Sequence, residues 1–355
     1  MVTDASGAAA LPWLTAPLQR ILATQRAHAL LLHGPRGVGE FELALLLAQG
    51  WLCEAADVPL AARPCRRCAS CHLVDARSHP DLMVLLPDAL RQRLGWSGGD
   101  AEEGGAEKAS KAKPSKDIKV EAVRAAVGFV QTTAARGRAK VLVLHPAERM
   151  NAIAANALLK TLEEPPGLAR FVLCSGDPAA LLPTIRSRCQ RVALAAPEPA
   201  EASAWLAARG VPEPALMLAA AGGQPQEVLA WAEFGIDAAL WSRLPGAVTA
   251  GDASVLHGWP LPLAVEALHK LCHDALCVAT GAAPRYFPAP ALRSRGDVAR
   301  LVAWSRALAD LARDAEHPWN VDLAVQAAVQ QGREALNPPR IAGAARRTAS
   351  LNSSR

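Results

Sequence analysis

Residues 29–41 read ALLLHGPRGVGEF. The first five residues form a short apolar run typical of a buried strand, and an apolar helical stretch follows the quoted segment. Between them, Gly34 and Gly39 have the spacing of a phosphate-binding loop, in which glycines allow backbone amides to wrap around phosphates. Glu40 replaces the lysine of such a loop, and Phe41 replaces the hydroxyl residue that holds magnesium. The segment therefore predicts the geometry of a nucleotide loop without its chemistry.

The two substitutions reverse the electrostatics of this loop. At about 4 Å from a phosphate, a lysine attracts and a glutamate repels by on the order of 4 kcal/mol each, at an effective dielectric constant of about 20. The dipole of the following helix contributes only about 0.3 to 2 kcal/mol, so it does not offset the change. Considered alone, the loop is equally compatible with an ordinary glycine-rich turn before a helix.

Short apolar runs recur at residues 82–86, 141–145 and 171–175, with helix-like stretches between them. Short buried strands that alternate with helices are typical of a parallel sheet covered on both faces. The sequence therefore predicts an α/β fold.

The run that begins at Val141 ends in His145 and Pro146. In a P-loop ATPase, the acids that hold magnesium and polarise the attacking water lie at the end of such a strand. Two sites are thus altered in the same sense, which favours a fold that has kept its shape and lost hydrolysis. We interpret His145 as a satisfied histidine at a strand end rather than as a catalytic base.

Composition places the chain among globular proteins. Its 355 residues are 51% hydrophobic and 20% charged, with a mean hydropathy of +0.11, and at about 150 residues per domain this length predicts two or three domains. No apolar stretch approaches the length of about 18 residues that spans a bilayer. The segment Met1–Leu14 contains Asp4 and lacks the basic start of a secretory signal, so a cytoplasmic location is expected. The net charge of +5 mildly favours an anionic partner.

The domain organisation follows from shifts in pattern. Strands are expected to stop after Arg191, and the hinge-like residues 195–200 lead into helical sequence. Helical periodicity marks residues 261–281, 297–314 and 321–336, with Asn320 as a plausible N-cap of the last. We predict the following parts: an α/β domain at 1–194, a flexible glycine- and lysine-rich insertion at 88–119, a small helical domain at 195–245, a larger helical domain at 246–337 and a flexible tail at 338–355.

Four cysteines lie close together in the sequence, in a module spanning residues 53–71. Cys53, Cys65, Cys68 and Cys71 follow the pattern C-x11-C-x2-C-x2-C, which is typical of a closed tetrahedral zinc site with a structural role. The segment Cys68–His72 also fits the C-x-x-C-H pattern of haem attachment, but that interpretation leaves Cys53 and Cys65 unexplained. Reduced free thiols are the remaining alternative.

Two further segments carry a recognisable signature. Residues 155–166 read ANALLKTLEEPP, and residues 182–189 read LPTIRSRC. Together with the altered phosphate loop and the four cysteines, in this order, they resemble the AAA+ clamp-loader family of bacterial DNA polymerase III, in its delta-prime branch. The resemblance extends from about Leu11 to Cys189, and the helices beyond it are consistent with the collar domain of that family.

The resemblance implies an AAA+ P-loop-type domain, a lid domain (195–245) and a collar domain (246–337), in a ring with ATP at the subunit interfaces. It implies that Arg188 acts in trans as an arginine finger on the ATP of a neighbouring subunit, where a fixed guanidinium stabilises the transferring phosphoryl group. A surface or capping arginine is the alternative. Gln226 stands where a sensor arginine would contact nucleotide. No bound ATP and no ATPase activity are therefore expected for the isolated chain.

The same resemblance implies partners: gamma/tau ATPase subunits and a delta subunit within the polymerase III holoenzyme, the sliding clamp, and primed DNA contacted indirectly or through its backbone. No membrane partner is expected. Lys160 and Arg170 could face DNA or belong to a solvated helix face. Two other functions remain open, an ATP-hydrolysing gamma/tau-type subunit and a zinc-dependent nucleic-acid-binding module.

Overall fold

The computed structural model describes residues 11–96, 114–292, 296–314 and 319–337. The chain divides into two compact units, residues 1–201 and 202–355, and each is described here by itself. The predicted tail at 338–355 and the middle of the predicted insertion, 97–113, lie outside the described residues.

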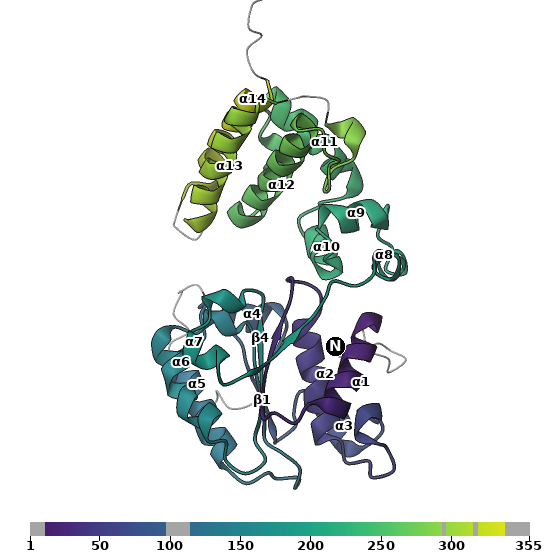
Figure 1. Ribbon diagram of the computed structural model, residues 1–355, viewed down its shortest axis with the longest axis vertical. Coiled ribbons are helices and arrows are strands. Elements are labelled where there is room, and N and C mark those ends of the chain that lie inside the picture. The colour runs from purple at the N-terminus through teal and green to yellow at the C-terminus, as the bar shows by residue number, and fades with distance from the viewer. Residues whose placement is uncertain (1–10, 97–113, 293–295, 315–318, 338–355) are drawn as a thin grey trace, which may run out of the picture. The chain divides into compact units, whose positions relative to one another are not determined.

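The first unit is built on a five-stranded parallel sheet with the strand order β2-β3-β4-β1-β5 (Figure 1). The strands are β1 (Ala29–His33), β2 (Leu82–Leu85), β3 (Val141–Leu144), β4 (Arg170–Ser175) and β5 (Gln190–Ala193). In the central register, Leu31 lies beside Leu173 on one side and beside Arg191 on the other. β3 is buried along its whole length, as expected for a strand in a parallel sheet covered on both faces.

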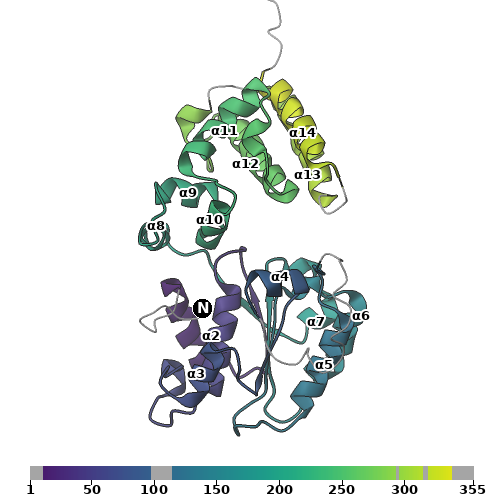
Figure 2. The same cartoon turned by 180° about the vertical axis from the view of Figure 1, so that it is seen from behind.

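Helices cover both faces of this sheet. In both views α1, α2 and α3 lie on one side, and α5, α6 and α7 lie on the other (Figures 1 and 2). The helices of this unit are α1 (Thr15–Thr24), α2 (Glu40–Leu52), α3 (Ala69–Asp75), α4 (Asp88–Arg93), α5 (Val120–Gln131), α6 (Ala152–Glu163) and α7 (Pro183–Arg186), with short 3-10 turns η1 (Pro12–Leu14), η2 (Leu60–Ala62), η3 (Ala147–Arg149) and η4 (Pro178–Ala180). α6 begins at the N-cap Asn151, whose side chain accepts a hydrogen bond from the amide of Ala154 at 2.9 Å.

The predicted α/β fold and its four strands are confirmed, but two details of the sequence analysis were wrong. The strands do not stop at Arg191, because β5 continues to Ala193. The segment 88–119 is not a flexible insertion throughout. Its first residues form α4, and near its end Ile118 is 1% exposed and forms an isolated bridge with Met150.

The second unit is helical in its described part. Beginning with α8, which crosses the boundary of the two units, the elements are α8 (Pro199–Ala207), α9 (Pro214–Ala220), α10 (Pro225–Ala232), α11 (Ala238–Ala250), η5 (Ser254–Leu256), α12 (Leu261–Ala279), η6 (Ala289–Ala291), α13 (Val298–Arg313) and α14 (Val321–Leu336). The last three α-helices confirm the predicted periodic segments, and the Asn320 side chain caps α14 by accepting from the amide of Leu323 at 3.2 Å. The predicted boundary at 245/246 falls inside α11, so a division into lid and collar stays a prediction.

Among the described helices, none combines the length and the apolar character that crossing a membrane requires.

Candidate functional site

The altered phosphate loop joins β1 to α2, as the sequence predicts. Gly39 adopts a φ of +105°, and a Cβ at this position would lie 2.5 Å from Cδ1 of Leu11. A Cβ at Gly34 would lie 2.6 Å from the carbonyl oxygen of Leu194. Packing within this unit therefore requires both glycines, whether or not a phosphate is bound.

The carboxyl group at position 40 is buried in this loop. Glu40 is 6% exposed, and burial raises its pKa to about 7, with repulsion from Glu42 and Glu148 adding to the shift. Hydrogen bonds from the backbone amides of Glu40 and Gly39 act in the opposite direction. The position therefore offers acidic oxygens where a phosphate loop offers an ammonium group, and nearby acids reinforce the repulsion of an anion.

Phe41 fills the space beside the strand end with an aromatic stack. Its ring stacks on that of His145, with centroids 4.8 Å apart and planes 17° apart, and meets the Trp96 ring edge-on at 5.9 Å. Burial lowers the pKa of His145 to about 4, with a smaller effect from Arg93, so the imidazole is neutral at pH 7. The rings of Phe41 and His145, at the two positions where the sequence analysis expects magnesium ligands in an ATPase, thus pack against each other.

His145 differs from the satisfied histidine that the sequence suggested. Its Nδ1 is buried and has no hydrogen-bond partner among the described residues. Pro146, which follows it, occupies the second position of the altered acidic site and offers no side-chain donor or acceptor. The pair therefore has no carboxylate to hold a metal ion.

Two residues of this region were missed by sequence reasoning. Trp96 lies inside the stretch 88–119 that was interpreted as a flexible insertion, and its only sequence signal was its size. Glu148 accepts a hydrogen bond from the amide of Gly176 at 3.2 Å through Oε1, while its buried Oε2 has no partner among the described residues. Its position three residues beyond His145 was the available signal.

Gln226, which was predicted to replace a sensor arginine, lies in the second unit. Gln226 is the second residue of α10 and is half-buried. An amide at this position carries no charge, so it cannot neutralise a phosphate as a sensor arginine does.

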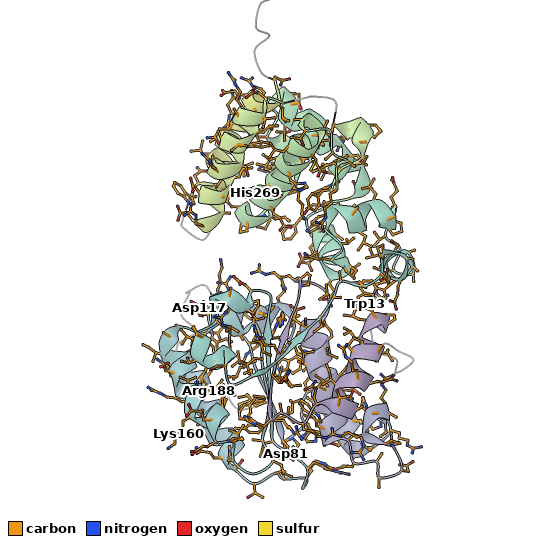
Figure 3. All side chains as sticks on the ribbon, viewed as in Figure 1. Trp13, Asp81, Asp117, Lys160, Arg188 and His269 are labelled. Atoms are coloured by element: carbon orange, nitrogen blue, oxygen red, sulfur yellow. The ribbon has the colours of Figure 1, made fainter. Side chains whose placement is uncertain are left out.

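Arg188 lies in the turn between α7 and β5, and its guanidinium is engaged at the end of α6 (Figure 3). Its Nε donates to Oε1 of Glu163 at 2.7 Å, and its Nη2 pairs with the same oxygen. Its Nη1 donates to the carbonyl of Thr184 at 2.9 Å and to Oγ of Ser187 at 3.4 Å. The Arg188 side chain is 31% exposed and Glu163 is 46% exposed, so the ion pair lies at the surface.

The two basic residues considered for DNA contact have different surroundings. Lys160 is exposed on α6. Arg170 is half-buried, donates to the carbonyl of Ala27 at 3.0 Å and lies over the Trp51 ring at 5.4 Å. Burial, with repulsion from Arg26, lowers the pKa of Arg170. Only Lys160 therefore fits the picture of a solvated basic residue.

The structure brings the four predicted cysteines together. The sulfurs of Cys53, Cys65, Cys68 and Cys71 all lie within 4.8 Å of one another, and those of Cys65 and Cys71 are 4.0 Å apart. A tetrahedral zinc ion with Zn–S bonds of about 2.3 Å requires sulfurs about 3.8 Å apart, so the cluster fits such an ion. His72 is exposed and does not belong to this cluster.

Backbone amides donate hydrogen bonds to the sulfurs of two cysteines. The amide of Cys65 donates to the sulfur of Cys53, and the amide of Cys71 donates to the sulfur of Cys68, each at 3.4 Å. Burial acts to raise the pKa of Cys68, but hydrogen bonds, with the amide of Cys71 first, outweigh it and lower the pKa to about 6. Burial raises the pKa of Cys53 and of Cys71, so among these three cysteines only Cys68 is held toward the thiolate, the form that binds metal ions. Four sulfur donors are nevertheless the ligand type that a soft cation prefers.

The cysteine module is anchored to the sheet by a buried polar network. Ser70, between two of the cysteines, donates to the carbonyl of Leu52 at 2.7 Å and contacts Nε2 of His79 at 2.7 Å. The amide of Asp81 donates to Nδ1 of His79 at 3.0 Å, so Nε2 carries the proton and donates to Ser70. Burial lowers the pKa of His79, which keeps it neutral.

A second connection runs through acidic residues. Arg136 pairs with Glu54, which follows the first cysteine, at 2.6 and 3.0 Å. The buried carboxylate of Asp81 (Figure 3) accepts from the amides of Ala135 and Arg136, at 2.7 and 2.9 Å, and pairs with Lys140 at 3.1 Å. The loop that leads into β3 is therefore fixed to the cysteine module, which indicates a structural role for the module.

A second group of potential metal ligands does not form a site. It comprises His273, Asp274 and Cys277 on α12. Both carboxylate oxygens of Asp274 already accept backbone amides, of residues 285–287, at 2.7 to 2.9 Å. The Cys277 sulfur lies 3.8 and 3.9 Å from the two ring nitrogens of His273, so it faces the ring rather than one nitrogen lone pair.

Comparison with known proteins relates the chain to subunits of DNA polymerase III. The family model described as "DNA polymerase III, delta subunit" matches residues 12–198. The chain is 43% identical over 205 residues to DNA polymerase III subunit delta' of Pseudomonas aeruginosa, covering 57% of this chain and 54% of that protein. It is 36% identical over 256 residues to the subunit delta' of Yersinia pestis, covering 68% of this chain and 67% of that protein.

The chain is also similar to a different subunit of DNA polymerase III. The chain is 35% identical over 162 residues to DNA polymerase III subunit tau of Escherichia coli, covering 46% of this chain and 20% of that protein. The chain spans 54% of the length of the Pseudomonas relative and 67% of the Yersinia relative. Since the family model matches residues 12–198, more than half of the chain, and the delta' relatives are 36% and 43% identical to it, the chain belongs to the delta-prime subunit family of the DNA polymerase III clamp loader.

Proposed function

We propose that this chain is a subunit of the replicative clamp loader that does not hydrolyse ATP and that donates Arg188 in trans to a neighbouring ATPase subunit. In this proposal it assembles with gamma/tau-type subunits and a delta subunit in a hetero-oligomeric ring of AAA+ domains. The ring opens or closes a sliding clamp on primed DNA, and this chain acts as its structural anchor. The family membership and the similarity to a tau subunit support these partners.

The observation that carries the proposal is the filled phosphate loop. Glu40 is buried where the lysine would stand, and the Phe41 ring packs on His145 where magnesium would be held. A nucleoside triphosphate would meet a negative or neutral carboxyl group in place of the lysine, and an aromatic ring in place of the magnesium ion. The same residues argue against an ATP-hydrolysing gamma/tau-type subunit, which needs the lysine, the hydroxyl and the acids. We expect calorimetry to detect no micromolar binding of ATP to the isolated chain.

The proposed role of Arg188 rests on its place in the Ser-Arg-Cys segment and on its position at the surface. A guanidinium that reaches a transferring phosphoryl group accelerates hydrolysis by about 10³ to 10⁵ in known systems. In the described part of the chain, the loop with phosphate-loop spacing lacks the lysine and the hydroxyl residue, so in this proposal the phosphate belongs to a neighbour.

The test is the ATPase rate of a reconstituted loader in the presence of clamp and primed DNA. We expect Arg188→Ala to abolish hydrolysis at the site that faces this subunit, with assembly unchanged by gel filtration. Arg186→Ala, which removes a neighbouring arginine on α7, is the matched control and should retain the parental rate. An unchanged rate for Arg188→Ala would refute the finger role and favour the zinc-dependent nucleic-acid-binding module.

We further propose that the four cysteines hold one structural zinc ion. A closed set of four thiolates leaves no open position for a substrate, and the gathering of all four sulfurs disfavours haem attachment, which would use two. When bound, the ion would crosslink the end of α2 to the start of α3. Metal analysis of protein purified without added metal should find about one zinc per chain, and its absence would refute this part of the proposal.

A further inference from the structure

The guanidinium of Arg188 is already occupied within its own chain. An arginine side chain carries five N–H groups. Two hydrogen bonds go to Oε1 of Glu163, from Nε and Nη2, and Nη1 serves Thr184 and Ser187. The usual bidentate grip on a phosphate uses two N–H groups of one fork. With these bonds in place, no complete fork is available to an outside phosphate.

The position of Glu163 is electrostatically unusual. It is the last residue of α6, where the helix dipole presents its negative end and disfavours a carboxylate. Glu164 follows directly, so two acids stand at this end. Both partners of the Arg188–Glu163 pair are partly exposed, and exposed pairs contribute little to stability. An acid at this position therefore contributes little to the stability of the fold. It can, however, control the availability of Arg188.

The pair also cancels charge. An arginine finger acts through a positive charge that stabilises negative charge on the transferring phosphoryl group. A carboxylate on the Nε edge of the guanidinium neutralises that charge and competes with the phosphate for the same donors. Because the pair is exposed, a triphosphate in a neighbouring subunit can displace the carboxylate at small cost.

We propose that Glu163 is a latch for Arg188: it holds the guanidinium within the chain until a neighbour presents its nucleotide in the engaged geometry. This inference rests on the proposed trans role of Arg188. Glu163 acts through Arg188 and touches no reacting atom, so it sets when the finger engages. An exposed pair biases such an equilibrium by at most about fivefold, which corresponds to about 1 kcal/mol.

The experiment measures ATP hydrolysis by a reconstituted loader without clamp and DNA. Glu163→Gln keeps the shape and one acceptor oxygen of the side chain but removes its charge. We expect it to raise the unstimulated rate about two- to fivefold, because Arg188 is released more readily. Glu164→Gln removes the same charge one residue away, where the described contacts show no pairing with Arg188, and should leave the rate unchanged.

A second variant separates release of Arg188 from other effects. The double variant Glu163→Gln with Arg188→Ala should hydrolyse ATP no faster than Arg188→Ala alone, because the latch has nothing left to hold. Equal assembly of all variants is checked by gel filtration, and their folding by thermal melting.

The failures of the two proposals are distinguishable. If Arg188→Ala lowers the stimulated rate but Glu163→Gln leaves the unstimulated rate unchanged or lowers it, the latch is refuted and the finger role stands. A gain from Glu163→Gln that persists in the double variant also refutes the latch. If Arg188→Ala has no effect on the stimulated rate, the finger role fails and the latch fails with it.

Discussion

Replacing Glu40 by glutamine should stabilise the first unit, and the gain should grow with pH. Burial raises the pKa of this carboxyl group from 4.5 to about 7. Between these values the folded chain holds a proton that the unfolded chain has lost, so the free energy of unfolding falls as the pH rises. Above about pH 7 the folded protein carries the full penalty of a buried carboxylate. Glutamine has the shape of the neutral form and never pays this penalty.

The size of the effect follows from the shift. A displacement of about 2.5 pKa units corresponds to about 3 kcal/mol when both states are ionised. The same relation gives a gain of only about 1 kcal/mol at pH 5.5, about one unit above the unfolded pKa of 4.5, where the unfolded carboxyl group is ionised but the folded one is still protonated. Urea unfolding at about pH 5.5 and pH 8, with zinc present at both, measures the two values.

A matched control is available in the same unit. Glu121 also lies in the first turn of a helix, α5, but it is exposed. Glu121→Gln should therefore change the free energy of unfolding by a few tenths of a kcal/mol at either pH. If Glu40→Gln stabilised the protein equally at both pH values, or destabilised it at pH 8, the carboxyl group would not be buried as described and the reasoning would be refuted.

Three other perturbations test separate parts of the site. His145→Phe keeps a ring beside Phe41 but removes an imidazole whose pKa is lowered to about 4. The free energy of unfolding of the variant, relative to that of the parent, should therefore rise by about 2 kcal/mol between pH 7 and pH 5. If urea unfolding gave the same difference at both pH values, this reasoning would be contradicted. Chelation of zinc should lower the free energy of unfolding by about 4 kcal/mol if zinc was present at about a thousand times its dissociation constant. Cys277→Ser is the control, because Cys277 lies outside the four-cysteine cluster, and it should respond to chelation as the parent does. An unchanged melting curve after chelation would argue against a bound metal ion. Gly39→Ala places a Cβ on a residue with a φ of +105°, 2.5 Å from Cδ1 of Leu11, and should lower the free energy of unfolding by about 1 to 3 kcal/mol. The loss should be smaller for Gly137→Ala, where φ is +67° but no atom lies within 4 Å of the added Cβ. Equal losses in the two thermal melts would show that the contact with Leu11 relaxes freely.

The strands that were predicted from the sequence are those whose burial shows in composition. β1 and β3 are continuous apolar runs because both of their faces are covered. β5 has a single buried residue, Val192, and includes Gln190 and Arg191, because it is an edge strand. α4 is short, has no buried residue and is rich in charge, so nothing in its sequence distinguished it from a loop.

The site was predictable where one local segment determines it. The exchanged residues Glu40 and Phe41 and the four cysteines are local patterns, and spacing alone identified them. The edge-on contact of Trp96 with Phe41, by contrast, joins residues that only the folded chain brings together. The pair of Arg188 with Glu163 spans 25 residues. Each half of that pair belongs to a recognised motif, but the sequence does not show that the motifs meet.

Glu40 and His145, two buried titratable groups of the first unit, act on stability in opposite directions. Glu40 destabilises the fold as the pH rises from 4.5 to about 7, because its pKa is raised. His145 destabilises it as the pH falls from 6.5 to about 4, because its pKa is lowered. Each shift is worth about 3 kcal/mol, and the two ranges overlap, so their slopes cancel between about pH 4.5 and 6.5. The parent protein should therefore show little pH dependence from this site, and each single replacement should expose the slope of the other group. The two slopes cancel only if Glu40 and His145 are both buried. A pH-dependent stability that appears in Glu40→Gln or in His145→Phe would therefore show that the remaining group is buried in the folded protein.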